Sequence, residues 1–455
     1  MKTFDYTKKG LRLQEGWDVI IAGGGTAGAV AAISCGMEGL RTLLIEAQGA
    51  LGGEQTLGLA TPIPPSQVAG DRLSSAIDME IRARTHARLP LEALGAEASR
   101  RFDPVALAGL LEEMALEHEV ELFYLTSLID VRREGERVHS LVLHNRDGLF
   151  AAAAPRFIDA TGDAELAFRA GVPCESGDAE GWNPSASLRF EMSGVDLGRF
   201  GDWLEGTGQK MLTRYPKLHW DMASPAASPA LKQLLLEECA AGHLSRSDFA
   251  RLKFWAVAGK PGTLNFSGPE HGREREAARA KSVSLKLTEG RRAIARLANF
   301  LRRAVPGFEE ACVAQVAVLP GIPESRRIQA RRRLVAEDLA AFRKFPDGIA
   351  TSNLPMEAPG ERSAAPVAGV PIPEKYWEIP FGALVPVGLD NLLVAGRCAG
   401  FDFAAQSAAR AQHTCRAMGE AAGIAVRLCQ DDGLPFPALD GARVRERMRR
   451  RGAPL

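Results

Sequence analysis

The segment that most constrains the fold is a glycine-rich turn between a short apolar run and a stretch of small residues. Residues 17–22 (WDVIIA) have the length and composition of a buried strand. The stretch that follows, TAGAVAAISCGMEG, is typical of a crossover helix, and LRTLLIE after it predicts a second strand. A strand, a helix and a parallel strand in this order form a right-handed unit. The sequence therefore predicts an α/β fold that begins with a Rossmann-type unit.

The turn, GGGTAG at 23–28, matches G-x-G-x-x-G in the strand-to-helix context where that motif binds a dinucleotide diphosphate. Gly23 permits the tight turn, Gly25 lets the backbone approach the diphosphate, and Gly28 lets the helix press on the sheet. Thr26 and Ala27 begin the helix, whose free N–H groups and partial positive charge favour phosphate. A glycine-rich turn that binds no nucleotide is the alternative.

Glu46 supports the dinucleotide interpretation. It ends the second strand at the distance expected of the acid that accepts a hydrogen bond from a ribose hydroxyl. A bare G-x-G-x-x-G would be weak evidence, but strand, turn, helix and acid together are strong. They leave open whether the dinucleotide carries a flavin or a nicotinamide.

Four segments resemble the FAD-dependent oxidoreductases of the glutathione-reductase and fumarate-reductase superfamily, and within it the family called FAD-dependent oxidoreductase. They are DVIIAGGGTAGAVAA at 18–32, the Gly52-Gly53 pair after Glu46, ATGDAELA at 160–167, and NLLVAGRCAG with the later AMGEAAGIA at 391–425. The resemblance implies FAD as cofactor. It places Gly52 and Gly53 along the diphosphate, Thr161 and Gly162 beside the adenosine end, and Gly396 and Arg397 near the ribitol and the flavin ring.

Two departures from the family pattern affect the site. Gly396-Arg397 stands where many relatives have Gly-Asp, whose carboxylate holds a ribitol hydroxyl, so Asp402 becomes an alternative partner. The second departure is GIPESRRI at 321–328, which resembles the family signature G-x-R-E-S-R-R-I with Pro323 in place of the first arginine. The loss of this guanidinium leaves the anchoring of the substrate open.

Four residues are candidates for catalysis. Arg326 lies in the ESRR cluster and is expected to bind an anionic group of the substrate, because guanidinium is a rigid fork of donors that matches a carboxylate. A structural Glu–Arg pair is an equally weighted alternative for this cluster. Arg410 and His413, with Gln406, precede or lie on the helix that passes the flavin in this superfamily; an ordinary helix face is the alternative. His271 is a candidate proton carrier, against the alternative of an inert loop histidine.

The expected domain organisation is discontinuous. Residues 1–172 and 375–440 are predicted to form the FAD-binding domain, with a β-meander between 120 and 158. An α+β cap or substrate domain is inserted at 173–374, and 441–455 is a basic C-terminal tail. The run SAARAQHTCRAMGEAAGIAVRLC predicts one long helix late in the chain.

Composition excludes several other classes. Lys plus Arg equals Asp plus Glu at 56 each, so no net charge attracts nucleic acid or an anionic membrane. The seven cysteines form no CxxC pair, which disfavours a disulfide framework or a metal site. No apolar leader and no apolar run of about 18 residues is present, so neither secretion nor membrane insertion is expected. We expect a cytoplasmic protein without metal; a homo-oligomer is left open.

The expected reaction is hydride transfer between flavin and a small polar organic substrate, carboxylated or sugar-derived, with an electron acceptor that the sequence does not identify. A flavin-binding electron-transfer subunit or scaffold without its own substrate is the alternative. A tRNA-modifying flavoprotein is less favoured, because the chain lacks a basic balance and a C-terminal helical domain.

Overall fold

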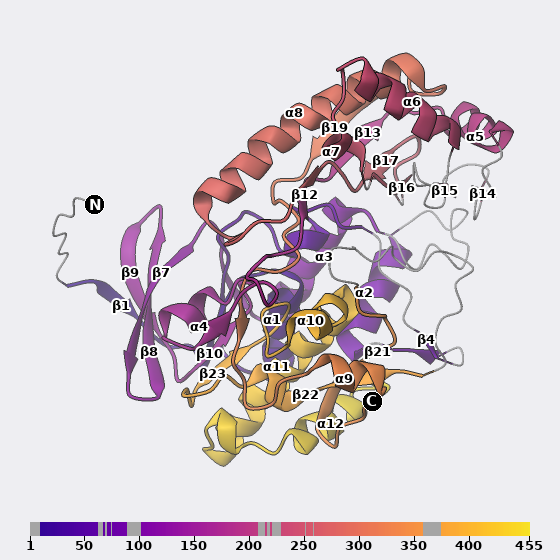
Figure 1. Ribbon diagram of the computed structural model, residues 1–455. Helices are drawn as coiled ribbons and strands as arrows, with labels where there is room; N and C mark the ends of the chain where they lie inside the picture. Colours follow the sequence, from indigo (N-terminus) through magenta and orange to yellow (C-terminus); the bar gives the residue numbers. More distant parts are fainter. Residues whose placement is uncertain are drawn as a thin grey trace.

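The fold is that of a computed structural model, which describes residues 10–61, 67–68, 71–73, 75–88, 102–207, 214–215, 219–220, 229–250, 252–257, 259–357 and 375–455. A parallel sheet with its helices occupies the lower half of Figure 1, and a second sheet with helices α5, α6, α7 and α8 lies at the top. The predicted α/β class with a Rossmann-type unit is confirmed.

The central sheet has five parallel strands. In spatial order they are β23 (Leu392–Val394), β10 (Arg156–Asp159), β2 (Val19–Ala22), β3 (Thr42–Ile45) and β6 (Glu121–Phe123). Every residue of β2, β3 and β23 is buried, because a parallel sheet is covered on both faces and its strands are therefore continuous apolar runs. Strands β6 and β10 belong to this sheet, whereas the sequence assigned both to the meander between 120 and 158.

The two faces of the sheet pack on different layers. Val19 and Ile21 face one hydrophobic core with the helices, and Ile20 and Ala22 face the other, because side chains alternate along a strand. The helical layer contains α1 (Thr26–Met37), α2 (Ala76–Ala87), α3 (Pro104–Glu117) and α11 (Gln412–Asp432). The other layer is the predicted β-meander, β7 (Ser127–Glu134), β8 (Arg137–Asn145) and β9 (Gly148–Ala153), extended by β1 (Arg12–Gln14).

Helix α11 packs closely on α1 through small residues. A Cβ on Gly419 would lie 2.2 Å from Ala27 O, and one on Gly423 would lie 2.6 Å from Ser34 Cβ. Both contacts advance in the same direction along the two helices, so α1 and α11 run parallel. The single long helix predicted here is broken: α10 (Phe403–Ala409) ends before Arg410, and α11 begins at Gln412.

The upper part is built on an antiparallel sheet in the order β16, β17, β13 and β19. Their bounds are Phe254–Ala256, Leu264–Phe266, Phe190–Ser193 and Cys312–Val316. Helices α5 (Leu197–Gly206), α6 (Pro229–Ala240), α7 (Arg246–Phe249) and α8 (Ala280–Ala304) contribute to its hydrophobic core. We call this part the cap; its predicted limits, 173–374, stay a prediction.

Shorter elements complete the two parts. They are α4 (Glu165–Arg169), α9 (Ala336–Ala340), and the strand pairs β11 (Cys174–Glu175) with β20 (Arg327–Ile328), β12 (Ala186–Ser187) with β18 (Glu270–His271), and β21 (Gly348–Ser352) with β22 (Trp377–Pro380).

The segment 441–455, predicted as a basic tail, forms helix α12 (Gly441–Arg450), which packs against α11. Val444 and Met448 are buried, and Arg447 and Arg451 pair with Glu38. Its apolar residues recur at helical spacing and form a face that packs on the protein. The many arginines between them are why this face was not recognised in the sequence. Within the described residues, no helix combines the length and the apolar character needed to cross a membrane.

Candidate functional site

The residues predicted to bind FAD gather at one edge of the parallel sheet. The turn 23–28 follows β2, Glu46 follows β3, Thr161 and Gly162 follow β10, and Gly396 and Arg397 follow β23. Because parallel strands end at the same edge, segments distant in the sequence meet there, which is where ligands of open α/β sheets bind.

The two glycine loops form a cradle. Gly25 and Gly52 are bridged in parallel fashion, Gly52 N donates to Gly24 O at 2.8 Å, and Thr26 Oγ1 donates to Gly52 O at 3.3 Å. A Cβ on Gly53 would lie 3.0 Å from Gly25 Cα, so the loops touch. Gly25, the N-cap of α1, provides no side-chain cap, and the amides of the first turn face this cradle.

The glycines of the turn differ in the space around them: two are packed tightly against the protein, and one borders open space. A Cβ on Gly23 would lie 2.7 Å from Ala160 O, and one on Gly28 would lie 1.8 Å from Gly23 O, so both glycines are required by the packing itself. A Cβ on Gly25 would meet nothing nearer than Ala160 O at 4.0 Å. The uncapped helix end with open space before it fits the diphosphate of FAD.

The carboxylate of Glu46 lies beside the glycine turn. Its Oε2 accepts from Gly24 N at 2.6 Å, and its Oε1 accepts from Gln48 N at 2.7 Å. Burial raises the pKa of Glu46 above its ordinary value, although the backbone donors counteract this. A carboxylate oxygen accepts more than one hydrogen bond, so the ribose role remains available to Glu46 and stays a prediction.

The segments after β10 and β23 contact each other. Arg397 Nε donates to Gly162 O at 2.9 Å, and its Nη2 donates to Asp163 Oδ1 at 2.9 Å. Burial alone would raise the pKa of Asp163, but the charge of Arg397 and the Ser325 hydroxyl bring it below its ordinary value. Gly396, at φ +108°, lies against the first turn of α1, since a Cβ there would be 3.4 Å from Ala27 Cβ. The two segments predicted to contact opposite ends of FAD thus join through Arg397.

Thr161 and Asp402 have structural partners of their own. The Thr161 hydroxyl donates to Asp159 Oδ1 at 2.7 Å and accepts from Glu165 N. Asp402 is the N-cap of α10, where its Oδ1 accepts from Ala405 N at 2.6 Å and its Oδ2 accepts from Ala336 N at 2.8 Å. Both carboxylate oxygens are therefore engaged by the backbone. The ribitol role of Asp402 stays a prediction.

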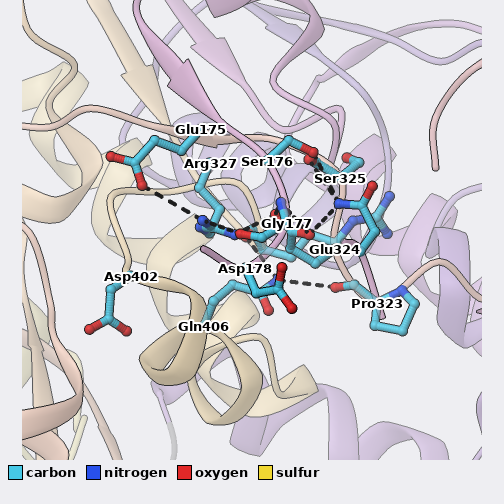
Figure 2. A network of polar contacts seen from close by, with 12 residues as sticks. Glu175, Ser176, Gly177, Asp178, Pro323, Glu324, Ser325, Arg327, Asp402 and Gln406 are labelled. Carbon is cyan, nitrogen blue, oxygen red and sulfur yellow. Dashed lines mark hydrogen bonds and ion pairs between the residues drawn. The ribbon is translucent and has the colours of Figure 1, made fainter. Parts of the chain in front are cut away.

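The ESRR cluster divides into a buried and an outward part. Figure 2 shows Glu324 and Arg327 paired, with Arg327 also donating to Gly177 O at 3.1 Å. Asn183 Nδ2 donates to Glu324 at 2.5 Å, and Gln406, predicted near the flavin, donates to Pro323 O at 3.0 Å. This buried network joins segments around 177, 324 and 406, which matches the structural interpretation of the cluster.

Arg326 points away from that network. Its Nη1 donates to Asp163 O at 3.1 Å and to Glu165 Oε1 at 2.9 Å, and its guanidinium lies 4.3 Å from the centre of the exposed Phe168 ring. The side chain is 27% exposed. The guanidinium is already paired within the protein, which favours the structural over the substrate-binding interpretation of Arg326.

The two candidate histidines lie in surroundings that disfavour the protonated imidazole. His413 is buried, neither of its ring nitrogens has a hydrogen-bond partner among the described residues, and burial lowers its pKa to about 4. His271 faces α8, since a Cβ on Gly290 would lie 3.2 Å from its Nε2. Burial, and then the charge of Lys286, lower the pKa of His271. Both side chains are neutral at pH 7.

The start of α11 supplies a contact that the sequence did not reveal. Gln412 Nε2 donates to Ala60 O at 2.7 Å, and its Oε1 accepts from Gln55 Nε2 at 2.6 Å. Ala411, the N-cap, provides no side-chain cap, so a second uncapped helix end lies near the glycine loops. Arg410, in the break before α11, is paired with Glu357 at 2.9 Å.

One face of the cap sheet lies on the segment that follows Gly53. The register aligns Glu191, Asn265 and Trp255 across β13, β17 and β16, opposite to the phenylalanines of the cap core. Trp255 Nε1 donates to Thr61 Oγ1 at 2.7 Å, and Asn265 Nδ2 donates to Leu59 O at 3.1 Å. A polar face of the cap thus covers the chain beside the diphosphate cradle. Among the described residues, no cluster of three or more His, Cys, Asp or Glu could hold a metal ion.

Several known proteins resemble this chain. The solved structure of p-nitrophenol 4-monooxygenase from Pseudomonas putida DLL-E4 is 11% identical, with a TM-score of 0.46 over 98% of this chain and 88% of that chain. A geranylgeranyl bacteriochlorophyll reductase-like protein from Thermoplasma acidophilum is 12% identical, with a TM-score of 0.45 over 97% of this chain and 85% of that chain.

Two comparisons concern the sequence. A nicotine dehydrogenase from Pseudomonas putida strain S16 is 60% identical over 37 residues, a stretch that covers 8% of this chain and 8% of the dehydrogenase. The sequence model of the family described as FAD dependent oxidoreductase matches residues 18–448. Because this match spans nearly the whole chain and the glycine cradle fits the cofactor, the protein belongs to the FAD-dependent oxidoreductase family and uses FAD.

Proposed function

We propose that this oxidoreductase transfers a hydride between a small polar organic substrate and FAD. The observation that carries the proposal is the polar face of the cap sheet, which lies on the segment directly after the diphosphate cradle. On this face Asn265 Oδ1 is buried and has no hydrogen-bond partner among the described residues, so it can accept from a small molecule held beside the cofactor. Carboxylated and sugar-derived compounds are the classes to test first.

The residues of the cradle would hold the cofactor. The open amides at the start of α1, with Gly25 and Gly53, would receive the diphosphate, and Glu46 would accept from the ribose. When bound there, FAD would supply the group that accepts a hydride from a substrate C–H bond, or that donates one to an activated C=C bond.

The cap would position the substrate and exclude water. Trp255 and Asn265 are held rigidly by Thr61 and Leu59, so their faces are organised before a substrate arrives. The uncapped start of α11 supplies partial positive charge near the same segment, because Gln412 lies at that helix end and contacts Ala60. These groups favour negative charge that develops during hydride transfer.

An anaerobic flavin-reduction screen tests the proposal. The purified holoprotein is mixed without oxygen with small hydroxy acids, sugars and amines, and absorbance of oxidised flavin is followed. Nicotine belongs in the amine set because of the short match to a nicotine dehydrogenase. We expect at least one class to bleach the flavin of the protein but not free FAD. If only dithionite bleaches it, the electron-transfer or scaffold alternative replaces the proposal.

A further inference from the structure

Arg189 is a cationic side chain on the polar face of the cap sheet. It lies between β12 and β13, and its neighbours Leu188 and Phe190 are buried in the cap core. Because side chains alternate along an extended chain, Arg189 extends to the opposite face, toward the segment after Gly53. Its guanidinium lies 5.3 Å from the centre of the Trp255 ring, the same ring that is fixed by Thr61.

The guanidinium of Arg189 has an unsatisfied donor. Its Nη1 is buried and donates to no acceptor in the described part of the chain. A buried donor of a charged group that lacks its hydrogen bond is unfavourable by more than the hydrogen bond would contribute. Arg326 and Arg397 differ, since each donates to a carboxylate of the protein and has no such buried donor in the described residues. Arg189 therefore has a vacant position for an acceptor.

Two charged residues, Glu54 and Arg410, influence the guanidinium of Arg189. Burial, the largest effect, lowers the pKa of Arg189, the charge of Glu54 raises it, and the charge of Arg410 lowers it. Glu54 and Arg410 thus lie within electrostatic range, but the carboxylate of Glu54 does not accept from Nη1. Glu54 follows the glycine loop directly, so Arg189 approaches the cofactor cradle from the cap side.

We propose that Arg189 binds a carboxylate of the substrate, with the Trp255 ring as the wall against which the adjoining part of the molecule packs. This proposal rests on the proposed function, and it adds the substrate class: a small carboxylic acid. A planar guanidinium held against an aromatic ring presents its fork of donors in a fixed direction, which matches the two oxygens of a carboxylate.

An oxygen of FAD itself is the other source of the same acceptor chemistry. The substrate is favoured because Arg189 belongs to the cap, while the backbone amides at the start of α1 already provide donors for the diphosphate. The experiment below separates the two sources.

The test uses the holoprotein and two pairs of probes, benzoate with benzamide and acetate with acetamide. Each pair has nearly the same shape, but only one member carries a charge. Binding is followed by the change in the flavin spectrum and independently by equilibrium dialysis, so no turnover is required. We expect benzoate or acetate to bind the native protein roughly tenfold or more tightly than its amide, the effect of hydrogen bonds to a charged group.

Two variants of Arg189 and one control complete the design. Arg189→Gln should abolish the preference for the carboxylate, and Arg189→Lys should keep part of it, because an ammonium retains the charge but loses the fork. Arg275→Gln is the matched control: Arg275 also lies over a tryptophan of the cap, 5.1 Å from the Trp182 ring, but is exposed. The Arg275→Gln variant should bind the four probes with the same affinities as the native protein.

Each remaining outcome is decisive. If neither acid binds the native protein more tightly than its amide, Arg189 is not a carboxylate site. If both Arg189 variants fold, as shown by their thermal melts, but lose FAD, the acceptor lies on the cofactor and the substrate assignment is wrong. If Arg189→Gln does not fold, the carboxylate assignment is tested by Arg189→Lys and by the comparison of each acid with its amide in the native protein. Failure of the flavin-reduction screen leaves these binding results intact, so the two proposals fail separately.

Discussion

Replacing Gly25 by alanine should weaken FAD binding while leaving the apoprotein folded. Gly25 has a φ of −67°, which alanine adopts without strain, and among the described residues its added Cβ would meet no atom nearer than 4.0 Å. Alanine is a poorer N-cap than glycine, but it also lowers the entropy of the unfolded chain, and these effects of about 1 kcal/mol or less nearly cancel.

The same methyl group would occupy the space in front of the uncapped end of α1. Forcing an extra methyl group into a filled site costs about 1–3 kcal/mol, which corresponds to a loss of FAD affinity of about 5- to 160-fold. The assay is titration of the apoprotein with FAD, followed by quenching of FAD fluorescence, beside a thermal melt of the apoprotein.

Two other glycines provide controls. A Cβ on Gly28 would lie 1.8 Å from Gly23 O, so Gly28→Ala should destabilise the apoprotein itself. Gly109 lies on α3 with no atom within 4 Å of an added Cβ, so Gly109→Ala should keep FAD affinity and raise stability by about 1 kcal/mol. Native FAD affinity in Gly25→Ala would refute the placement of the diphosphate at this helix end.

Four further substitutions test other parts of the protein. Glu46→Ala should weaken FAD binding about tenfold or more, because a hydrogen bond to a charged group contributes about 1.5–3 kcal/mol. The ionised form of Glu46 is the acceptor, and its pKa is raised above 4.5. The affinity of the native protein for FAD should therefore decrease as the pH falls toward and through that raised pKa. The Glu46→Ala variant should not show this decrease. Asp78→Asn would leave the buried Arg416 without its carboxylate, 2.6 Å away, and should lower the free energy of unfolding by about 3–5 kcal/mol in a denaturant melt. The control is Glu446→Gln: Glu446 forms an exposed pair with Arg450, so the loss should be about 1 kcal/mol or less. Arg326→Lys should leave both FAD content and the substrate dependence of flavin reduction unchanged, because Arg326 is paired with Glu165; a raised substrate requirement would instead support the role predicted from the sequence.

Features that depend on neighbouring residues were readable from the sequence. The strand, the glycine turn and the start of α1 were predicted correctly because the tight turn and the close approach of the backbone impose glycine at fixed spacing. Asp402 shows the limit of such reasoning: its position in the sequence suggested a ribitol contact, and only the folded chain revealed that it caps α10 and also accepts from Ala336 N.

Helical segments were predicted better than their breaks and faces. The small residues of α11 predicted a helix, but the break at Arg410 and the burial of His413 depend on packing against α1 and α2. The basic segment after 441 was misjudged in the same way, because its two buried apolar residues are few among many arginines.

The sequence alone determined the FAD fold and the positions of the glycine loops, since each of those requirements is satisfied within a few residues of the chain. Tertiary structure decided the use of the charged residues. The Glu324–Arg327 pair is buried against Gly177, and the Trp255 ring beside Arg189 is bound to Thr61; both contacts join segments more than 100 residues apart that meet only after folding. The free energy of a charged side chain is set by burial and by the partners around it, and neither is encoded by its neighbours in the sequence.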